Sequence, residues 1–287
     1  MATLRDIKRR ITSVKSTQQI TNAMKMVSAA KLRRAQERLI NARPYAEGLQ
    51  KVIAHVADQE EHGRHPLLQV RDPKRVCYLV ITSDRGLCGS FNANVTRHAK
   101  AEVDQQNGAP PYIISFGRKG YDFFNRRDYE VGSKYLNLFN ELNFHHAVQV
   151  AEEIREAYIS EQYDRVVVVY NHFKSAGTQE LRLEQLLPIQ PQAPESNKYA
   201  LADYVYEPSP EGILGEAIPK NLTIQIWRSL LESSASEHAA RMVAMDAATE
   251  NAKEMIYQLT LTYNKVRQAA ITTEISEIVG GAEALRG

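Results

Sequence analysis

The run Thr82–Phe91 (TSDRGLCGSF) has the composition of a turn that could hold a phosphate group. It follows an apolar, strand-like stretch and precedes a helix-compatible one, and doubly wound α/β folds bind phosphates at such junctions. Its glycines, however, are spaced only as G-x-x-G, without the G-x-G-x-x-G of dinucleotide sites or the Gly-Lys-Ser/Thr of a P-loop. A nucleotide site is therefore one interpretation. The favoured one is a tight structural turn, in which Asp84 and Arg85 fix the turn or lie at the surface.

The histidines and cysteines show no pattern for metal binding or catalysis. His145 and His146 are adjacent, so on a helix they point about 100° apart and cannot chelate one metal ion. The eight histidines form no His-x-x-x-His arrangement, and Cys77 and Cys88 form no Cys-x-x-Cys. No G-x-S-x-G nucleophile motif occurs either. The sequence thus predicts no metal, no cofactor and no catalytic site, and so few cysteines favour a reducing compartment.

The net charge of +2 conceals an uneven distribution of charged residues. Residues 1–58 contain 12 Lys+Arg and 4 Asp+Glu, a balance of +8, while the other 229 residues hold 24 basic and 30 acidic groups, a balance of −6. Such a split indicates an acidic partner or nucleic acid. Nucleic acid is disfavoured because no aromatic residues are interleaved with the basic ones. An acidic protein partner and a simply solvated helix face both remain open.

The elements that must position these groups are two long helices and a mixed middle region. Neither Gly nor Pro occurs in residues 1–43 or 220–279, and uninterrupted runs of that length are typical of coiled coils or helical repeats. Thr3 and Asp6 predict a capping box at the first helix. We expect the two helices to pair antiparallel, with the longer C-terminal helix extending beyond its partner. The apolar stripe of the first helix is predicted to run through Leu4, Ile7, Ile11 and Val14 and then to shift to Ile20, Met24 and Val27.

The middle region alternates between strand-like and helix-like patterns. Buried, β-branched runs predict strands at 75–82, 112–116 and 164–170. Helical spacing predicts helices at 90–106, 118–127 and 145–162. Residues 178–189 are expected to add an edge strand, and the proline-rich residues 190–219 to form a loop. This alternation predicts a small α/β sheet with parallel strands.

Three segments carry a family resemblance. They are ITTEISEIVGGAEA at 271–284, ITNAMKMVSAAKL at 20–32 and SDRGLCGSFN at 83–92. Together they resemble the motifs of the gamma-subunit family of F-type ATP synthases, and the likeness covers essentially the whole chain. The resemblance implies an α/β fold in which a long antiparallel coiled coil of N- and C-terminal helices carries an inserted Rossmann-like α/β central domain that binds no nucleotide. The expected segments are 1–58 and 220–287 for the coiled-coil helices, 74–190 for the Rossmann-like domain and 191–219 for a loop or foot.

The resemblance also implies a function, that of a rotor shaft. Proton flow would turn a membrane ring of c subunits, and the shaft would couple that rotation to ATP synthesis or hydrolysis in a hexamer of alpha and beta subunits. The implied partners are the alpha and beta subunits, the epsilon subunit and the c ring, with no nucleic acid and no direct membrane span. Catalysis would belong to the beta subunits, so the chain itself is expected to be non-catalytic.

Site residues follow from the resemblance position by position. Met24 and Lys25 match positions that face an acidic loop of the beta subunit, and the basic side chains of Arg33 and Arg34 are expected to face the stator as well. Residues on the C-terminal helix match positions of stator contact or coupling: Arg241, Arg267, Gln268, Thr272 and Glu274. Tyr204 and Glu207 match the foot that meets the c ring and epsilon.

The expected location is the cytoplasmic side of a bacterial plasma membrane, as a peripheral protein. The sequence contains no run of 18 apolar residues that could span a bilayer. The basic N-terminus could pass for a transit peptide, but that interpretation would discard a well-patterned helix. Neither Cys77 nor Cys88 resembles a regulatory thiol pair.

Overall fold

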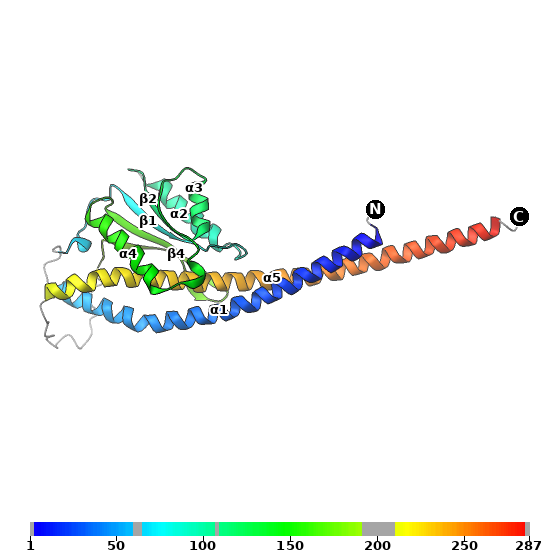
Figure 1. The fold of residues 1–287 in the computed structure, drawn as a ribbon, viewed down its shortest axis with the longest axis horizontal. Coiled ribbons are helices and arrows are strands. Elements are labelled where there is room, and N and C mark those ends of the chain that lie inside the picture. Colours follow the sequence, from blue (N-terminus) through cyan, green and yellow to red (C-terminus); the bar gives the residue numbers. More distant parts are fainter. Residues whose placement is uncertain (1–2, 60–64, 107–108, 191–209, 285–287) are drawn as a thin grey trace. The chain divides into compact units, whose positions relative to one another are not determined.

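The computed structural model describes residues 3–59, 65–106, 109–190 and 210–284. The chain divides into two compact units, one of residues 29–241 and the other of residues 1–28 together with 242–287. Helix α1 (Leu4–Gln59) and helix α5 (Pro210–Ala284) each contribute to both units (Figure 1). The predicted fold class, two long terminal helices with a mixed α/β region inserted between them, is confirmed.

The larger unit contains a five-stranded sheet in the order β3-β2-β1-β4-β5. The first four strands run parallel to their neighbours: β1 (Val76–Ile81), β2 (Tyr112–Phe116), β3 (Val131–Tyr135) and β4 (Arg165–Ser175). Strand β5 (Thr178–Leu187) pairs antiparallel with β4 and is the predicted edge strand. The strand order reverses between β1 and β4, which is where a doubly wound sheet forms its crevice.

Both faces of the sheet are covered, which explains why β1 is apolar throughout. One set of alternate β1 side chains (Cys77, Leu79, Ile81) lies in a core with α4 (Phe144–Ile159) and α5. The other set lies in a second core with α2 (Phe91–Gln105) and α3 (Arg118–Asn125). Figure 1 shows α4 and α5 on one side of the sheet and α2 and α3 on the other. In a strand that is buried on both faces, polar residues do not alternate with apolar ones, because neither face meets solvent.

Helix α5 begins at Pro210, ten residues before the predicted start, so the expected loop up to residue 219 is wrong over its last ten residues. Pro210 suits the first turn of a helix because the missing N–H would have no partner there. Pro219 lies inside the helix despite the hydrogen bond it removes. Leu214 and Ile218 are buried in the core beside it, and this packing outweighs the local breaker signal.

The smaller unit contains an antiparallel helix pair. The Thr21 and Thr249 hydroxyls lie 2.8 Å apart, and Lys25 Nζ lies 2.5 Å from Asp246 Oδ1, so the numbering rises on one helix as it falls on the other. The predicted shift of the stripe to Ile20 and Val27 is wrong, because both side chains are exposed. Ile7, predicted to lie in the stripe, is buried. Farther along α1 the buried positions are Thr21 and Ser28, which keep a heptad spacing with small hydroxyl side chains.

Both ends of the smaller unit were predictable. The capping box is confirmed, since Thr3 N–H donates to Asp6 Oδ2 (3.1 Å) and Asp6 N–H donates to Thr3 Oγ1 (3.3 Å). The C-terminal helix extends beyond its partner as expected, because every residue from Arg267 to Ala284 is exposed.

Candidate interaction surface and the turn after strand β1

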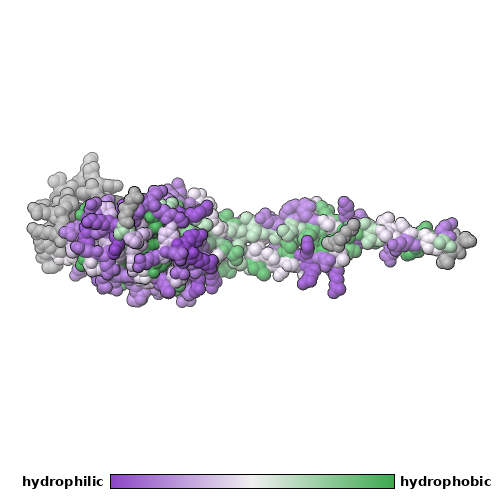
Figure 2. Space-filling model, turned by 90° about the horizontal axis from the view of Figure 1, so that it is seen from above, coloured by the Kyte–Doolittle hydropathy of each residue, from purple (hydrophilic) through white to green (hydrophobic). Residues whose placement is uncertain are grey.

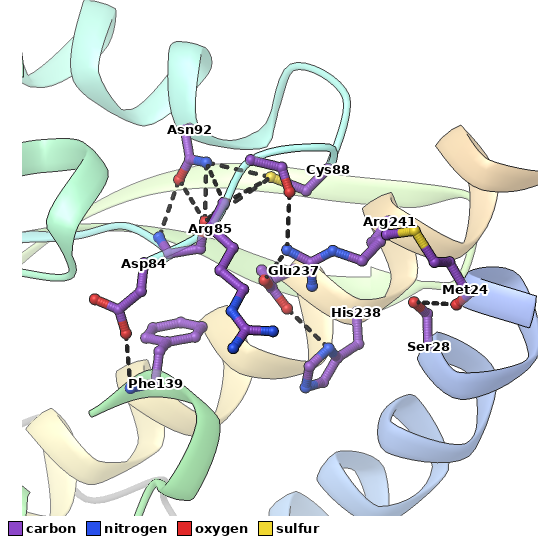
Figure 3. Close-up of polar contacts among 12 residues, drawn as sticks. Met24, Ser28, Asp84, Arg85, Cys88, Asn92, Phe139, Glu237, His238 and Arg241 are labelled. Atoms are coloured by element: carbon purple, nitrogen blue, oxygen red, sulfur yellow. Dashed lines mark hydrogen bonds and ion pairs between the residues drawn. The ribbon is translucent and has the colours of Figure 1, made fainter. Parts of the chain in front are cut away.

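Asp84 anchors the turn that follows β1. Its Oδ1 accepts hydrogen bonds from the backbone N–H groups of Arg118 (3.0 Å) and Asn137 (2.8 Å), and its Oδ2 accepts one from Phe139 (3.1 Å; Figure 3). Arg118 is the first residue of α3, where the free N–H groups of a helix attract an anion. The carboxylate of Asp84 therefore ties the turn after β1 to the start of α3 and to the segment that follows β3. This agrees with the structural turn favoured from sequence.

The rest of the turn is held by a compact polar cluster around Asn92. Asn92 Oδ1 accepts from Ser83 N–H at 2.9 Å, its Nδ2 lies 3.2 Å from Cys88 Sγ, and Ser83 Oγ donates to Arg85 O at 2.5 Å. Leu87 and Gly89 both have positive φ, which closes the turn tightly. Burial raises the pKa of the Cys88 thiol, so the thiol stays neutral and unreactive.

Arg241 joins this turn to helix α5. Its Nη2 lies 2.5 Å from Glu237 Oε1 and 3.2 Å from the carbonyl oxygen of Gly86, to which it donates (Figure 3). His238 Nδ1 lies 2.8 Å from the other Glu237 oxygen. Burial alone would raise the pKa of Glu237, but the contacts with His238 and Arg241 outweigh it and lower that pKa below its usual value. Arg241, expected to touch the stator, is thus mostly buried and committed to contacts within the chain.

Met24 and Lys25 lie on α1 in the smaller unit, and both are half-buried. The Met24 carbonyl accepts a hydrogen bond from Ser28 Oγ (2.8 Å; Figure 3). Lys25 forms the ion pair with Asp246 described above, in which both side chains remain substantially exposed. The ammonium group of Lys25 is therefore shared between an internal partner and the solvent.

Arg33 and Arg34 lie on the part of α1 that belongs to the larger unit, and both are exposed. Arg33 lies near Glu37 on its own helix (3.4 Å), and Arg34 makes no ion pair with any residue that the structure describes. Both guanidinium groups are consequently available to another chain.

The remaining predicted contact residues lie on the exposed end of α5. Arg267, Gln268, Thr272 and Glu274 are exposed at this end, and Thr272 Oγ1 donates a hydrogen bond to the Gln268 carbonyl of its own helix. Large apolar side chains are exposed among them: Ile271, Ile275, Ile278 and Val279. Figure 2 shows apolar residues, in green, interleaved with hydrophilic ones toward this end of the helix. Tyr204 and Glu207 lie outside the described residues.

Sequence reasoning missed a second polar cluster, between α5 and the β4–β5 hairpin. It includes the contact of His172 Nδ1 with Glu232 Oε2, at 2.5 Å, and the ion pair of Arg228 with Glu184. The available signal was the run of charged and hydroxyl residues at 232–238 inside an otherwise helical, apolar pattern. In the described part of the chain, no three His, Cys, Asp or Glu side chains are grouped so as to hold a metal ion. Nor does any helix described there combine the length and apolar character needed to cross a bilayer.

Comparison with known proteins matches residues 3–285 to the ATP synthase family. The chain is 50% identical to the ATP synthase gamma chain of Geobacter sp. (strain M21) and 51% identical to that of Chlorobium phaeobacteroides (strain BS1), with complete coverage of both chains in each case. Among solved structures, it resembles a chain of the central stalk and c-ring of the Tetrahymena thermophila mitochondrial ATP synthase, with a TM-score of 0.62 and 31% identity over 80% of this chain and 99% of that one. A rotor chain of the Euglena gracilis mitochondrial enzyme shares the fold, with a TM-score of 0.69 and 22% identity over 93% of this chain and 98% of that one.

Proposed function

The chain belongs to the ATP synthase gamma-chain family, and we propose that it is the central rotor shaft of an F-type ATP synthase. Proton flow turns the c ring, the shaft turns with it, and the shaft drives the catalytic sites of the alpha and beta hexamer through their conformations. The chain itself is non-catalytic. The observation that carries this proposal is the identity of about half of all residues, over the full length, to bacterial gamma chains.

The exposed end of α5 supports this role. A surface that must slide past its surroundings at every rotary angle cannot rely on deep, interlocking pockets. The exposed isoleucines of this end, interleaved with small and charged residues, suit such a sliding contact. The proposed stator contacts are Met24, Lys25, Arg33, Arg34, Arg267, Gln268, Thr272 and Glu274, whereas Arg241, also expected from sequence, is committed to Glu237 and the turn after β1.

The other proposed partners are the c ring and the epsilon subunit, through the foot that contains Tyr204 and Glu207. The proposed segment boundaries are those expected from sequence, with one change. The foot ends at residue 209, because α5 begins at Pro210. The complex is membrane-associated, and we place this chain on the cytoplasmic side of a bacterial plasma membrane, as a peripheral subunit.

Reconstitution with alpha and beta subunits tests the proposal directly. We expect the chain to be required for rapid ATP hydrolysis and to rotate a filament attached to it, while the isolated chain neither hydrolyses ATP nor binds it saturably. Absence of both stimulation and rotation would overturn the rotor assignment. Saturable ATP binding by the isolated chain would instead favour a nucleotide-dependent role.

Charge reversal tests the basic surface. Changing Lys25, Arg33 and Arg34 together to Glu is expected to weaken ATP-driven proton pumping more than ATP hydrolysis, because long-range attraction to acidic loops becomes repulsion. The matched control reverses Arg97, Arg118 and Arg126 of the inserted domain. Adding Asp246→Lys to the triple variant restores the internal ion pair, so any defect that persists belongs to the contact with the stator. Unchanged proton pumping would contradict the proposed electrostatic attraction between these basic side chains and the stator.

A further inference from the structure

Four polar residues on α5 contact the inserted domain. Arg228, Glu232 and Ser236 follow one another at intervals of four residues, so they lie in one row along the helix. Arg241 continues the contacts one turn beyond Glu237, its own ion-pair partner. We call these four residues (Arg228, Glu232, Ser236 and Arg241) the polar row.

Each member of the row has a defined partner in the inserted domain. Arg228 Nη2 lies 2.5 Å from Glu184 Oε2 on β5, and Glu232 Oε2 lies 2.5 Å from His172 Nδ1 on β4. Ser236 Oγ donates to the carbonyl oxygen of Asn171 on β4 at 3.0 Å. Arg241 donates to the Gly86 carbonyl in the turn after β1, as described above.

The partners are themselves held in place. Glu184 also accepts a hydrogen bond from the Tyr170 hydroxyl (2.9 Å), and the side chain of Asn171 donates to the Phe91 carbonyl (3.3 Å). The Glu232 side chain is only 7% exposed. The row therefore joins two surfaces whose polar groups are already oriented.

Stability alone is a poor reason for such a row. Desolvating charges offsets most of what a buried ion pair gains, and apolar residues of similar volume stabilise as well or better. The same helix already packs Leu222, Ile226 and Leu230 into the core. Apolar contacts are non-directional, so their resistance to sliding comes from close packing alone. Hydrogen bonds and ion pairs require a fixed geometry and do resist sliding.

We propose that the polar row locks the inserted domain to α5 against rotation about the helix axis and so transmits torque between them. The inference rests on the proposed rotor function, because torque about α5 becomes sliding at this interface. Arg228, Glu232, Ser236 and Arg241 are positioning residues in this account, and none of them takes part in chemistry.

The test uses the chain assembled with alpha and beta subunits fixed to a surface. A bead is attached through Arg126→Cys on the inserted domain or through Glu216→Cys on α5 itself. Both positions are exposed. The test variant is Arg228→Met with Glu232→Leu, and Arg97→Met, on α2, is the matched control. The angular fluctuation of the bead on the stalled rotor is measured at each position.

With two of the four directional contacts removed, we expect about a twofold increase in the angular variance of the bead on the inserted domain. The variance of the bead on α5, the rate of ATP hydrolysis and the behaviour of Arg97→Met should not change. The swapped pair Arg228→Glu with Glu184→Arg should restore most of the stiffness that Arg228→Glu alone loses. Equal variance in the unmodified chain and the test variant would overturn the proposal.

Two further outcomes are separable. If the unmodified chain rotates neither bead, the rotor assignment itself fails, independently of the row. If Arg228→Met with Glu232→Leu does not fold, Ser236→Ala with Arg241→Met removes the other two contacts. Increased variance in that variant supports the row, and unchanged variance overturns it.

Discussion

Helix α5 contains two nine-residue stretches, 231–239 and 271–279, that contrast in both polarity and burial. All nine residues of the first are buried, although six of them are Glu, Ser or His. All nine residues of the second are exposed, although four of them are Ile or Val. Between these two stretches of one helix, burial therefore runs opposite to polarity.

The contrast teaches that partners and side-chain size, more than hydrophobicity, decide what is buried here. In the first stretch, Ser and Ala side chains are small enough for neighbouring elements to pack closely, and each charged group has a partner. In the second stretch, the isoleucines are exposed and belong to neither core of the residues that the structure describes. Removing a single side chain should thus destabilise the isolated chain in order of its burial, whatever its polarity, because a buried partner is left without its contact.

The largest expected effect compares two isoleucines of α5. Ile226→Ala should lower the free energy of unfolding by about 2–5 kcal/mol, because it leaves a cavity in the core. Ile278→Ala should change it by less than about 0.5 kcal/mol, because that side chain is exposed. Urea denaturation of the isolated variants measures both. Equal losses of unfolding free energy in the two variants would contradict the ranking by burial.

A buried acid should outweigh an exposed hydrophobe. Asp84→Ala leaves three backbone N–H groups without their acceptor, so we expect a loss of about 3 kcal/mol and faster hydrogen exchange at those amides. Asp72→Ala, at an exposed position, is the control and should be nearly neutral. A loss for Asp84→Ala no greater than that for Ile278→Ala would contradict the ranking.

The buried carboxylate of Glu237 predicts a pH dependence. Its folded-state pKa lies below the ordinary value of 4.5, so the stability it contributes is present above that pH and is lost as the pH falls through the lowered pKa. Glu237→Gln should cost about 2 kcal/mol at neutral pH, and the difference from the unmodified chain should shrink below pH 4.5. Denaturation midpoints of the unmodified chain and of Glu237→Gln, measured from neutral pH to below pH 4.5, test this pH dependence. Glu274→Gln, at an exposed position, is the control. If the difference in stability between the unmodified chain and Glu237→Gln stays constant with pH, the destabilisation comes from packing and not from the charge.

The smallest effect is expected for the ion pair of Lys25 with Asp246. Both side chains remain about half exposed, at 40% and 50%, so water screens the attraction. Lys25→Met should lower the stability of the isolated chain by no more than about 1 kcal/mol. Adding salt should weaken the pair further. A loss as large as that of Glu237→Gln would show that exposure does not set the order.

The sheet illustrates what periodicity can and cannot reveal. Strands β1, β2 and β4 were predictable because burial on both faces leaves continuous apolar runs. Strand β3 was not, since its sequence VGSKY contains a glycine and only alternate residues are partly buried. A Cβ atom at Gly132 would overlap the ring of Tyr112 on the neighbouring strand. The residue that hides β3 in the sequence is thus the one that lets it pair.

The helices show the same limit. Their existence and antiparallel pairing followed from the absence of breakers, but the position of the seam did not, because Thr21 and Ser28 pack where larger apolar residues were expected. At the candidate site, the exposure of Arg33, Arg34 and the end of α5 agrees with a contact surface. Arg241 and Lys25 have internal partners instead, at 237 and 246. The pairing of Lys25 with Asp246 joins residues far apart in the sequence, so no local pattern reveals it. Glu237 and Arg241 have the i,i+4 spacing of a helical ion pair, but their burial depends on the tertiary fold.

The carboxylate of Asp84 has one more consequence. As part of the chain, it fills its site at a fixed effective concentration and cannot dissociate, whereas a bound phosphate compound would come and go with its supply. The energy state of a cell changes the levels of free nucleotides and phosphate from moment to moment. Because a side chain of the protein itself holds the start of α3 and the segment after β3, their positions do not depend on the supply of a small ligand.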